Sequence, residues 1–484
     1  MKDDMSSAFQ SAEFKQLLAK YESMLSNKKN VYFEADELKL IAEYYASIGS
    51  TGASDEAISY ALNLHPDNLD ILIFKCHSLI INDKIEDAQL LIDSLPDQQD
   101  YEVRLLQAEI CLAESRFADA KQILKELYLE SRDIDTMLDI AQLYLDNHDM
   151  KSAKEWIDKA YKQEPNSSEV LNMKALLCFS NGELSKAAKL YNRLLDDFPY
   201  SIEYWQNLVK CYLYTNKLEK AQDALEFAMS IDDENLINWE LKGNYYLLQN
   251  DLEEALSCFK YAEQHAKEKS YIKMILLKVY FLMQNHIEVV EYASILIDEY
   301  KLQDYEMADV YHMRAFAYLA LKQDKDAMKD VISGLSYNNH YSLLYVVKGE
   351  IHLYNLETSL GIEAFKYAEK YADDVIDILR LIAMACLRTN YVEEALSYFQ
   401  QYGEKATGEE KYANYYFIAL CYYWLNEEHE MFVNLVKAAI YSPSTLFQER
   451  MMLPKSLHDE KFHQICLFIL DQLKSGEIDP YLYM

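Results

Sequence analysis

The pattern that decides the fold of this chain is clearest in WELKGNYYLLQNDLEEALSCFKYA, residues 239–262. The first alanine of this stretch ends a series spaced 34 residues apart: Ala153, Ala187, Ala221 and Ala255. Twelve residues before each alanine lies a small residue, in the order Ala141, Ala175, Val209 and Gly243. A fixed period of about 20–50 residues is typical of a stacked array of repeats. The sequence therefore predicts repeated helix pairs.

The spacing has a physical reason. Small residues near positions 8 and 20 of a 34-residue unit let two helices approach closely, and large residues at positions 4, 11 and 24 fill the space around that contact. The pattern resembles the tetratricopeptide repeat, which favours Trp at position 4, Gly at 8, Tyr at 11, Ala at 20, Phe at 24 and Ala at 27. The seventh repeat matches it with Trp239, Gly243, Tyr246, Ala255, Phe259 and Ala262.

The phase can be followed from residue 35 to residue 445, which makes about twelve repeats. Their position-20 residues are Ser54, Ala88, Ala120, Ala153, Ala187, Ala221, Ala255, Val289, Ala327, Gly361, Ala395 and Met431. The resemblance implies an all-α fold, a right-handed superhelical solenoid of antiparallel helix pairs. We expect a capping helix in residues 1–34, one solenoid over 35–445, and a capping helix with a tail in 446–484. Trp239 is predicted to be a buried core residue.

Composition limits the classes of partner. The chain has 484 residues, only 10 Gly and 7 Pro, and a formal net charge of −33. A surface of that sign repels phosphate backbones and anionic lipids, so we expect neither nucleic acid nor a membrane as partner. No apolar run approaches the ~18–20 residues of a membrane span. The N-terminus has no secretory pattern, and the eight cysteines follow the repeat phase without a CxxC pair, which together favour reduced thiols and a cytoplasmic location.

Motifs that carry chemistry are missing from the sequence. It contains no GxGxxG, Walker loop, HExxH or GxSxG. His458 and His463 are five residues apart beside the expected cap, which favours a surface role over a metal site. We therefore expect a protein that is not an enzyme and that has no cofactor and no metal. An enzyme carried on the last forty residues is disfavoured because that segment is too short for a catalytic domain.

In the family that the chain resembles, positions 2, 5, 9 and 12 of each first helix line a concave groove. Here that face is acidic in repeats one to six and carries aromatic and cationic residues in repeats seven to twelve. The predicted partner-binding residues are Lys278, Phe281, His312, Phe316, Arg380, Met384, Arg388, Tyr416 and Tyr423. The alternative is that these aromatic residues pack against adjacent helices and that the acids only keep the face solvated. The carboxylate clamp of some family members is absent, because Glu43 follows Lys39 where the clamp needs an asparagine.

These observations lead to a functional hypothesis. We expect a non-catalytic scaffold or adaptor that binds another protein or a peptide segment in its groove. The alternative is a peptide-sensing regulatory protein, although such sensors usually add an effector domain, and here the repeats occupy nearly the whole chain. Cationic residues at position 7 (Lys75, Lys174, Lys242, Arg314 and Lys348) are interpreted as long stems packed along the core, with a shared ligand-binding role as the alternative.

Overall fold

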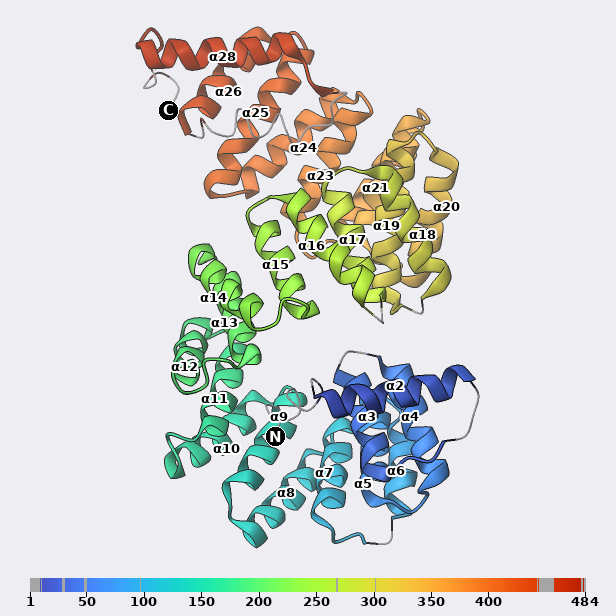
Figure 1. Ribbon diagram of the computed structural model, residues 1–484. Helices are drawn as coiled ribbons and strands as arrows, with labels where there is room; N and C mark the ends of the chain where they lie inside the picture. The colour runs from blue at the N-terminus through green and yellow to red at the C-terminus, as the bar shows by residue number, and fades with distance from the viewer. Residues whose placement is uncertain are drawn as a thin grey trace. The chain divides into compact units, whose positions relative to one another are not determined.

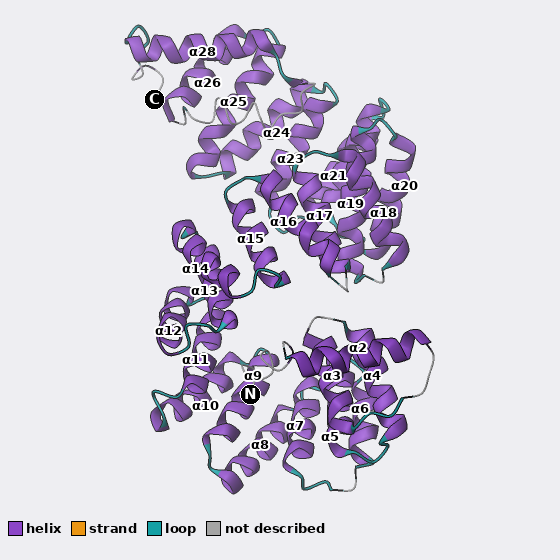
Figure 2. Ribbon diagram, in the orientation of Figure 1, coloured by secondary structure: helices purple, strands orange, loops and turns teal. Residues whose placement is uncertain are grey.

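The computed structural model describes residues 9, 11–27, 31–47, 50–95, 97–266, 269–300, 302–441, 443, 457–479 and 482. All 26 regular elements in this described part are α-helices, so the all-α class is confirmed (Figure 2). By its internal contacts the chain divides into two compact units, Met1–Ile272 and Lys273–Met484, and the boundary falls within α17 (Ser270–Leu282).

The first unit begins with α2 (Ala12–Asn27), and helix pairs follow it (Figure 1). The pairs are α3 (Ala35–Ser47) with α4 (Thr51–Leu64), α5 (Leu69–Ile81) with α6 (Ile85–Asp93), α7 (Tyr101–Ala113) with α8 (Phe117–Ser131), α9 (Ile134–Asp146) with α10 (Met150–Gln163), α11 (Ser168–Ser180) with α12 (Leu184–Asp197), α13 (Ile202–Tyr214) with α14 (Leu218–Ile231), and α15 (Leu236–Leu248) with α16 (Leu252–His265).

The second unit continues the same pairing and ends with a single helix. The pairs are α17 with α18 (His286–Glu299), α19 (Asp304–Ala320) with α20 (Asp324–Tyr337), α21 (Ser342–Tyr354) with α22 (Thr358–Tyr371), α23 (Val375–Arg388) with α24 (Val392–Lys405), and α25 (Gly408–Trp424) with α26 (Glu428–Tyr441). The last helix is α28 (Glu460–Ser475). These twelve pairs are the twelve predicted repeats.

Small residues set the distance between the two helices of a pair. All twelve position-20 residues are buried. A Cβ atom added to Gly243 would lie 2.5 Å from Cζ of Phe259, which stands at position 24 of the same repeat. The glycine therefore makes room for the ring, as the spacing predicts, and the pair α15–α16 closes around this contact.

A left-handed residue ends the first helix of the pairs. In each A-to-B turn from repeat two to repeat twelve, one residue has φ between 52° and 72°: Asp83, Ser115, His148, Gly182, Asn216, Asn250, Gln284, Lys322, Leu356, Asn390 and Asn426. The next amide then donates back across the turn, as the Asp251 N–H does to the Tyr246 carbonyl at 2.9 Å. This arrangement satisfies carbonyls at the helix end and reverses the chain direction.

Trp239 differs from its prediction. Its side chain is only half-buried, because it lies at the edge of the helix pair. The indole stacks on Tyr261 with ring centroids 4.2 Å apart, and its Nε1–H donates to the Asp233 carbonyl at 2.7 Å. Position 4 thus supports a stacked ring at the rim, and Trp205 stacks on Phe227 in the same way one repeat earlier.

Several position-7 cations lie over rings or pair with acids of their own neighbourhood. Lys174 Nζ is 3.5 Å from the Tyr161 ring centroid, and Lys242 Nζ is 4.9 Å from the Trp239 centroid. Lys75 pairs with Asp55 at 3.1 Å, and Arg314 makes a two-pronged pair with buried Asp330. These contacts agree with stems packed along the protein, and cation–π attraction holds the charged ends.

Candidate functional site

Two phenylalanines from successive first helices meet on one face of the second unit. Phe281 lies at position 12 of α17 and Phe316 at position 9 of α19, and both rings are half-buried. Their centroids are 5.4 Å apart at an interplanar angle of 60°. This edge-to-face geometry is a favourable aromatic arrangement. The structure thus brings these two predicted residues into direct contact.

Two histidines and a tyrosine extend this contact. His312 lies 5.9 Å from the Phe281 ring and 5.9 Å from the Tyr341 ring, and His286 lies 6.2 Å from the Phe316 ring, all between centroids. We call Phe281, His286, His312, Phe316 and Tyr341 the aromatic row. It connects α17, α18 and α19 with the residue that precedes α21 (Figure 1). Neither His286 nor Tyr341 belonged to the predicted site, because both lie at helix starts, outside the face that the spacing selects.

Burial determines the protonation of both imidazoles. The Nδ1 atoms of His286 and His312 are buried and have no hydrogen-bond partner among the described residues. Burial lowers the pKa of His286, and it lowers the pKa of His312 to about 4 even though the nearby Asp309 carboxylate acts in the opposite direction. Both rings are therefore neutral at pH 7.

Lys278 reaches the row through an acid. Its Nζ lies 3.4 Å from Oδ2 of Asp309, and the Tyr341 hydroxyl donates to Oδ1 of the same carboxylate at 2.8 Å. Burial, with the Asp309 charge beside it, raises the pKa of Tyr341, which keeps the phenol protonated as a donor. Asp309 offsets part of the positive charge of Lys278, which reduces its attraction for an acidic ligand.

Arg388 is likewise occupied. Its Nε and Nη2 donate to the two carboxylate oxygens of Glu350 at 2.6 and 2.7 Å, and Glu350 is only 3% exposed. The guanidinium carbon also lies 5.3 Å from the centroid of the Phe316 ring. Arg388 therefore supports the aromatic row from one side. Its charge is already paired, which corrects the expectation that it supplies local positive charge for a ligand.

Arg380 and Met384 lie apart from this cluster. Arg380 is exposed on α23, and Met384 is half-buried against the hydrophobic core around α23 to α26. Within the described residues, no ion pair or ring contact joins either side chain to the aromatic row. Arg380 is the predicted cation whose charge no described carboxylate offsets within 4 Å.

Tyr416 and Tyr423 lie beneath the chain's own last helix. The Phe462 ring of α28 is 5.6 Å from the Tyr416 centroid and 5.2 Å from the Tyr423 centroid. The Tyr423 hydroxyl donates to Oδ1 of Asp459, just before α28, at 3.4 Å. Tyr416 is buried and Tyr423 half-buried. For these two residues the packing alternative describes the structure better than an open binding face.

Acidic side chains crowd the first helices of the first unit. Burial raises the pKa of Glu43, Glu102, Asp139 and Glu240, and the Asp70 charge adds to the effect at Glu43 as the Asp139 charge does at Glu102. Asp139 is held by the Tyr101 hydroxyl, which donates to Oδ2 at 2.7 Å. Asp139 and Glu240 were not singled out from the sequence; Asp139 lies one position off the selected face, whereas Glu240 lies on it.

Two further searches of the described residues bear on the chemistry. They contain no group of three or more His, Cys, Asp or Glu side chains arranged to hold a metal ion. They also contain no helix that is both long and apolar enough to cross a membrane. The arrangement in the second unit offers half-buried aromatic area with neutral imidazoles, which is suited to non-covalent contact.

Two family models match parts of the chain. The model described as anaphase-promoting complex, cyclosome, subunit 3 matches residues 146–228, and the tetratricopeptide repeat model matches residues 111–177. The BBSome complex member BBS4 of Mus musculus is 29% identical over 106 residues, which cover 22% of this chain and 20% of that protein, and the Bos taurus protein is 28% identical over the same length. The matched segment thus spans about a fifth of these curated relatives.

Solved structures show the same kind of fold at low identity. The crystal structure of the APC/C hetero-tetramer Cut9–Hcn1 is 13% identical, with 96% of this chain and 95% of that chain covered and a TM-score of 0.39. The human IFIT1 dimer with m7Gppp-AAAA is 14% identical, with 82% and 95% covered and a TM-score of 0.43. From its twelve helix pairs, their buried position-20 residues and the matching repeat model, this chain is a tetratricopeptide-repeat protein.

Proposed function

We propose that the chain is a non-catalytic scaffold that binds a segment of another protein through the aromatic row of its second unit. The observation that carries the proposal is the contact between Phe281 and Phe316, whose rings keep part of their surface exposed although each is packed on the other. Aromatic side chains offer large contact area at low entropy cost and are frequent among binding hot spots. The names of the matched proteins, members of the BBSome and of the anaphase-promoting complex, support a role in protein assemblies.

The electrostatics of the face define the partner more closely. Lys278 and Arg388 are paired with Asp309 and Glu350, so the charges next to the rings are largely balanced. Arg380 is the exposed cation on the neighbouring helix α23. We therefore expect a partner segment that places apolar side chains on the row and directs an acidic group, where it has one, toward Arg380.

Replacement of both phenylalanines tests this function. The full-length chain and its Phe281→Ala/Phe316→Ala variant are used to capture proteins from the native cell, and the captured proteins are quantified by mass spectrometry. A partner that uses the row should be reduced at least ~10-fold, which corresponds to about 1.4 kcal/mol.

The control is Tyr305→Ala, which removes a 65% exposed aromatic ring outside the row in the same unit. Circular dichroism must show that all three proteins keep the same helical content. Equal capture by the wild type and the double variant would contradict binding through the row.

A further inference from the structure

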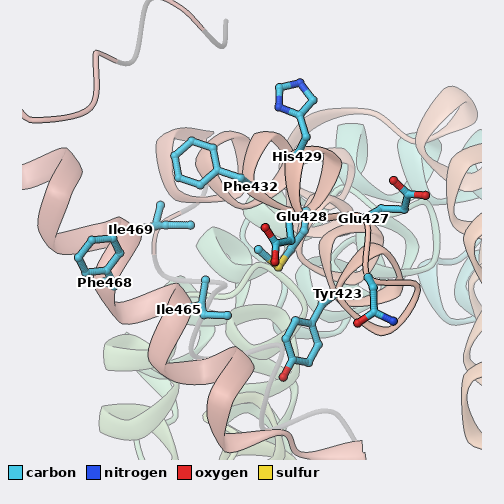
Figure 3. A pocket seen from close by; sticks show the side chains of 10 residues that line it. Tyr423, Glu427, Glu428, His429, Phe432, Ile465, Phe468 and Ile469 are labelled. Atoms are coloured by element: carbon cyan, nitrogen blue, oxygen red, sulfur yellow. The ribbon is translucent and has the colours of Figure 1, made fainter.

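A second surface with a different character lies at the end of the repeats. A cavity of about 640 Å³ opens between α28 and the turn that joins α25 to α26 (Figure 3). Ile465 and Ile469 form its wall on α28, and Met431 and Phe432 form the wall on α26. The volume falls in the range of about 300–1,000 Å³ that is usual for ligand sites.

The position of α28 explains why the cavity stays open. Phe462, Cys466 and Ile469 of α28 are buried, so this stripe of the helix packs onto the last repeat. Phe468, on the neighbouring side of the helix, is 60% exposed beside the cavity. In a repeat array each pair is normally covered by the next pair. A single helix covers less area than a pair, and apolar side chains therefore remain at the edge.

The mouth of this cavity is acidic. Glu427 and Glu428 line it together with His429, and Figure 3 shows the Glu428 side chain directed into the space opposite Ile465. Glu428 lies in the first turn of α26, where a carboxylate complements the helix dipole. Among the described residues neither carboxylate has a cation within 4 Å, and the whole chain carries a net charge of −33.

We propose that this cavity binds an amphipathic, basic helix of a partner protein, which inserts large apolar side chains between α26 and α28 and places lysine or arginine beside Glu427 and Glu428. A helix with apolar residues at positions i and i+4 matches the two isoleucines, which are themselves four residues apart on α28. A second copy of this chain would bring another strongly negative surface to an acidic mouth, so charge favours a basic partner over self-association. This site is separate from the aromatic row and does not depend on it.

A designed peptide probes the site directly. A fluorescein-labelled twelve-residue peptide with leucines at helical spacing and lysines elsewhere is titrated with the full-length chain, and binding is followed by fluorescence anisotropy. The same peptide with glutamate in place of lysine serves as the charge control. The lysine peptide should bind and the glutamate peptide should not.

Matched variants separate the cavity from the general negative field. Glu427→Gln/Glu428→Gln should weaken binding at least ~10-fold, or about 1.4 kcal/mol. Glu393→Gln/Glu394→Gln removes the same charge from the first turn of α24 and should leave binding nearly unchanged. Phe468→Ser, at a largely exposed position, should also weaken binding without loss of helicity by circular dichroism.

Three results would overturn the proposal. Equal weakening by the two glutamine pairs would mean that the peptide follows the overall charge. Unchanged binding to the Phe468→Ser variant would exclude the apolar contact. A concentration-dependent dimer in sedimentation experiments that Phe468→Ser abolishes would show that a second copy of the chain occupies the site.

Discussion

Arg388 of α23 grips Glu350 of α21 with two parallel hydrogen bonds, 2.6 and 2.7 Å long, across adjacent repeats. The Glu350 carboxylate is almost fully buried, so this arginine is its source of neutralising charge among the described residues. The same guanidinium packs near the Phe316 ring. The pair therefore joins two repeats and supports the rings proposed to bind a partner.

Removal of the arginine should expose how much the second unit depends on this pair. Arg388→Met leaves a buried carboxylate without a partner and should lower the free energy of unfolding by about 3–5 kcal/mol. The double variant Arg388→Met/Glu350→Leu should recover much of the loss, since both charges are then gone. Urea unfolding followed by circular dichroism measures both. The control Arg380→Met, at an exposed position of the same helix, should stay within about 0.5 kcal/mol of the wild type.

The turn residue Leu356 should be a site of backbone strain. It has φ of 62° and an 82% exposed side chain, so its conformation is unfavourable for leucine and little packing compensates. Leu356→Gly should raise stability by about 1 kcal/mol. The reciprocal control is Gly182→Leu, at the equivalent turn position, where φ is 72° and no atom lies within 4 Å of an added Cβ. It should lose a similar amount, and a gain there would contradict the explanation by strain.

The helix pairs were predictable because their requirement is local and periodic. Two helices approach closely only where both carry small residues, so the alanines at 34-residue intervals located every pair. The left-handed turn residues were not predictable in this way. Asp83, Lys322 and Leu356 occupy equivalent turn positions although only the backbone geometry is shared, so no residue type marks them.

The candidate site was predictable only in its aromatic part. Helical spacing placed Phe281, His312 and Phe316 on one face, and their rings do meet. The state of Arg388 depends on Glu350, 38 residues earlier, and that of Tyr416 depends on a helix beyond the last repeat. Periodicity within one repeat carries no information about such partners from other repeats.

Gly243 should tolerate no side chain. Gly243→Ala would place a Cβ 2.5 Å from the Phe259 ring, which must shift, and overpacking of this kind costs about 1–3 kcal/mol. Gly52→Ala in α4 is the matched control, because nothing lies within 4 Å of the added atom and alanine is the better helix former by up to about 1 kcal/mol. Thermal unfolding should therefore move in opposite directions for the two variants.

The cysteines should react slowly in the folded protein. All eight are free and buried, and burial raises the pKa of Cys76 and of Cys421 to about 12. A rise from 9 to 12 reduces the thiolate population about a thousandfold. Reaction with Ellman's reagent at pH 8 should be slow until denaturant is added, when all eight thiols should react. Rapid labelling of Cys111, Cys178 or Cys386 in the native protein would contradict their placement inside the helix pairs.

Acid should weaken the second unit through His312. Its pKa is about 4 in the folded chain against 6.5 as the ordinary value, so between these pH values the unfolded chain binds a proton that the folded chain does not. Stability is therefore complete above pH 6.5 and falls as the pH is lowered toward 4, by at most about 3 kcal/mol.

Comparison of variants isolates that contribution. The His312→Gln variant lacks the titrating group, so its free energy of unfolding should fall less than that of the wild type between pH 7.5 and pH 4.5 in urea titrations. His340→Gln, which replaces an exposed histidine of the same unit, is the control. If the wild type and the His312→Gln variant lose stability in parallel over this range, the imidazole is not held neutral by burial. The aromatic row would then be open enough to admit water around His312.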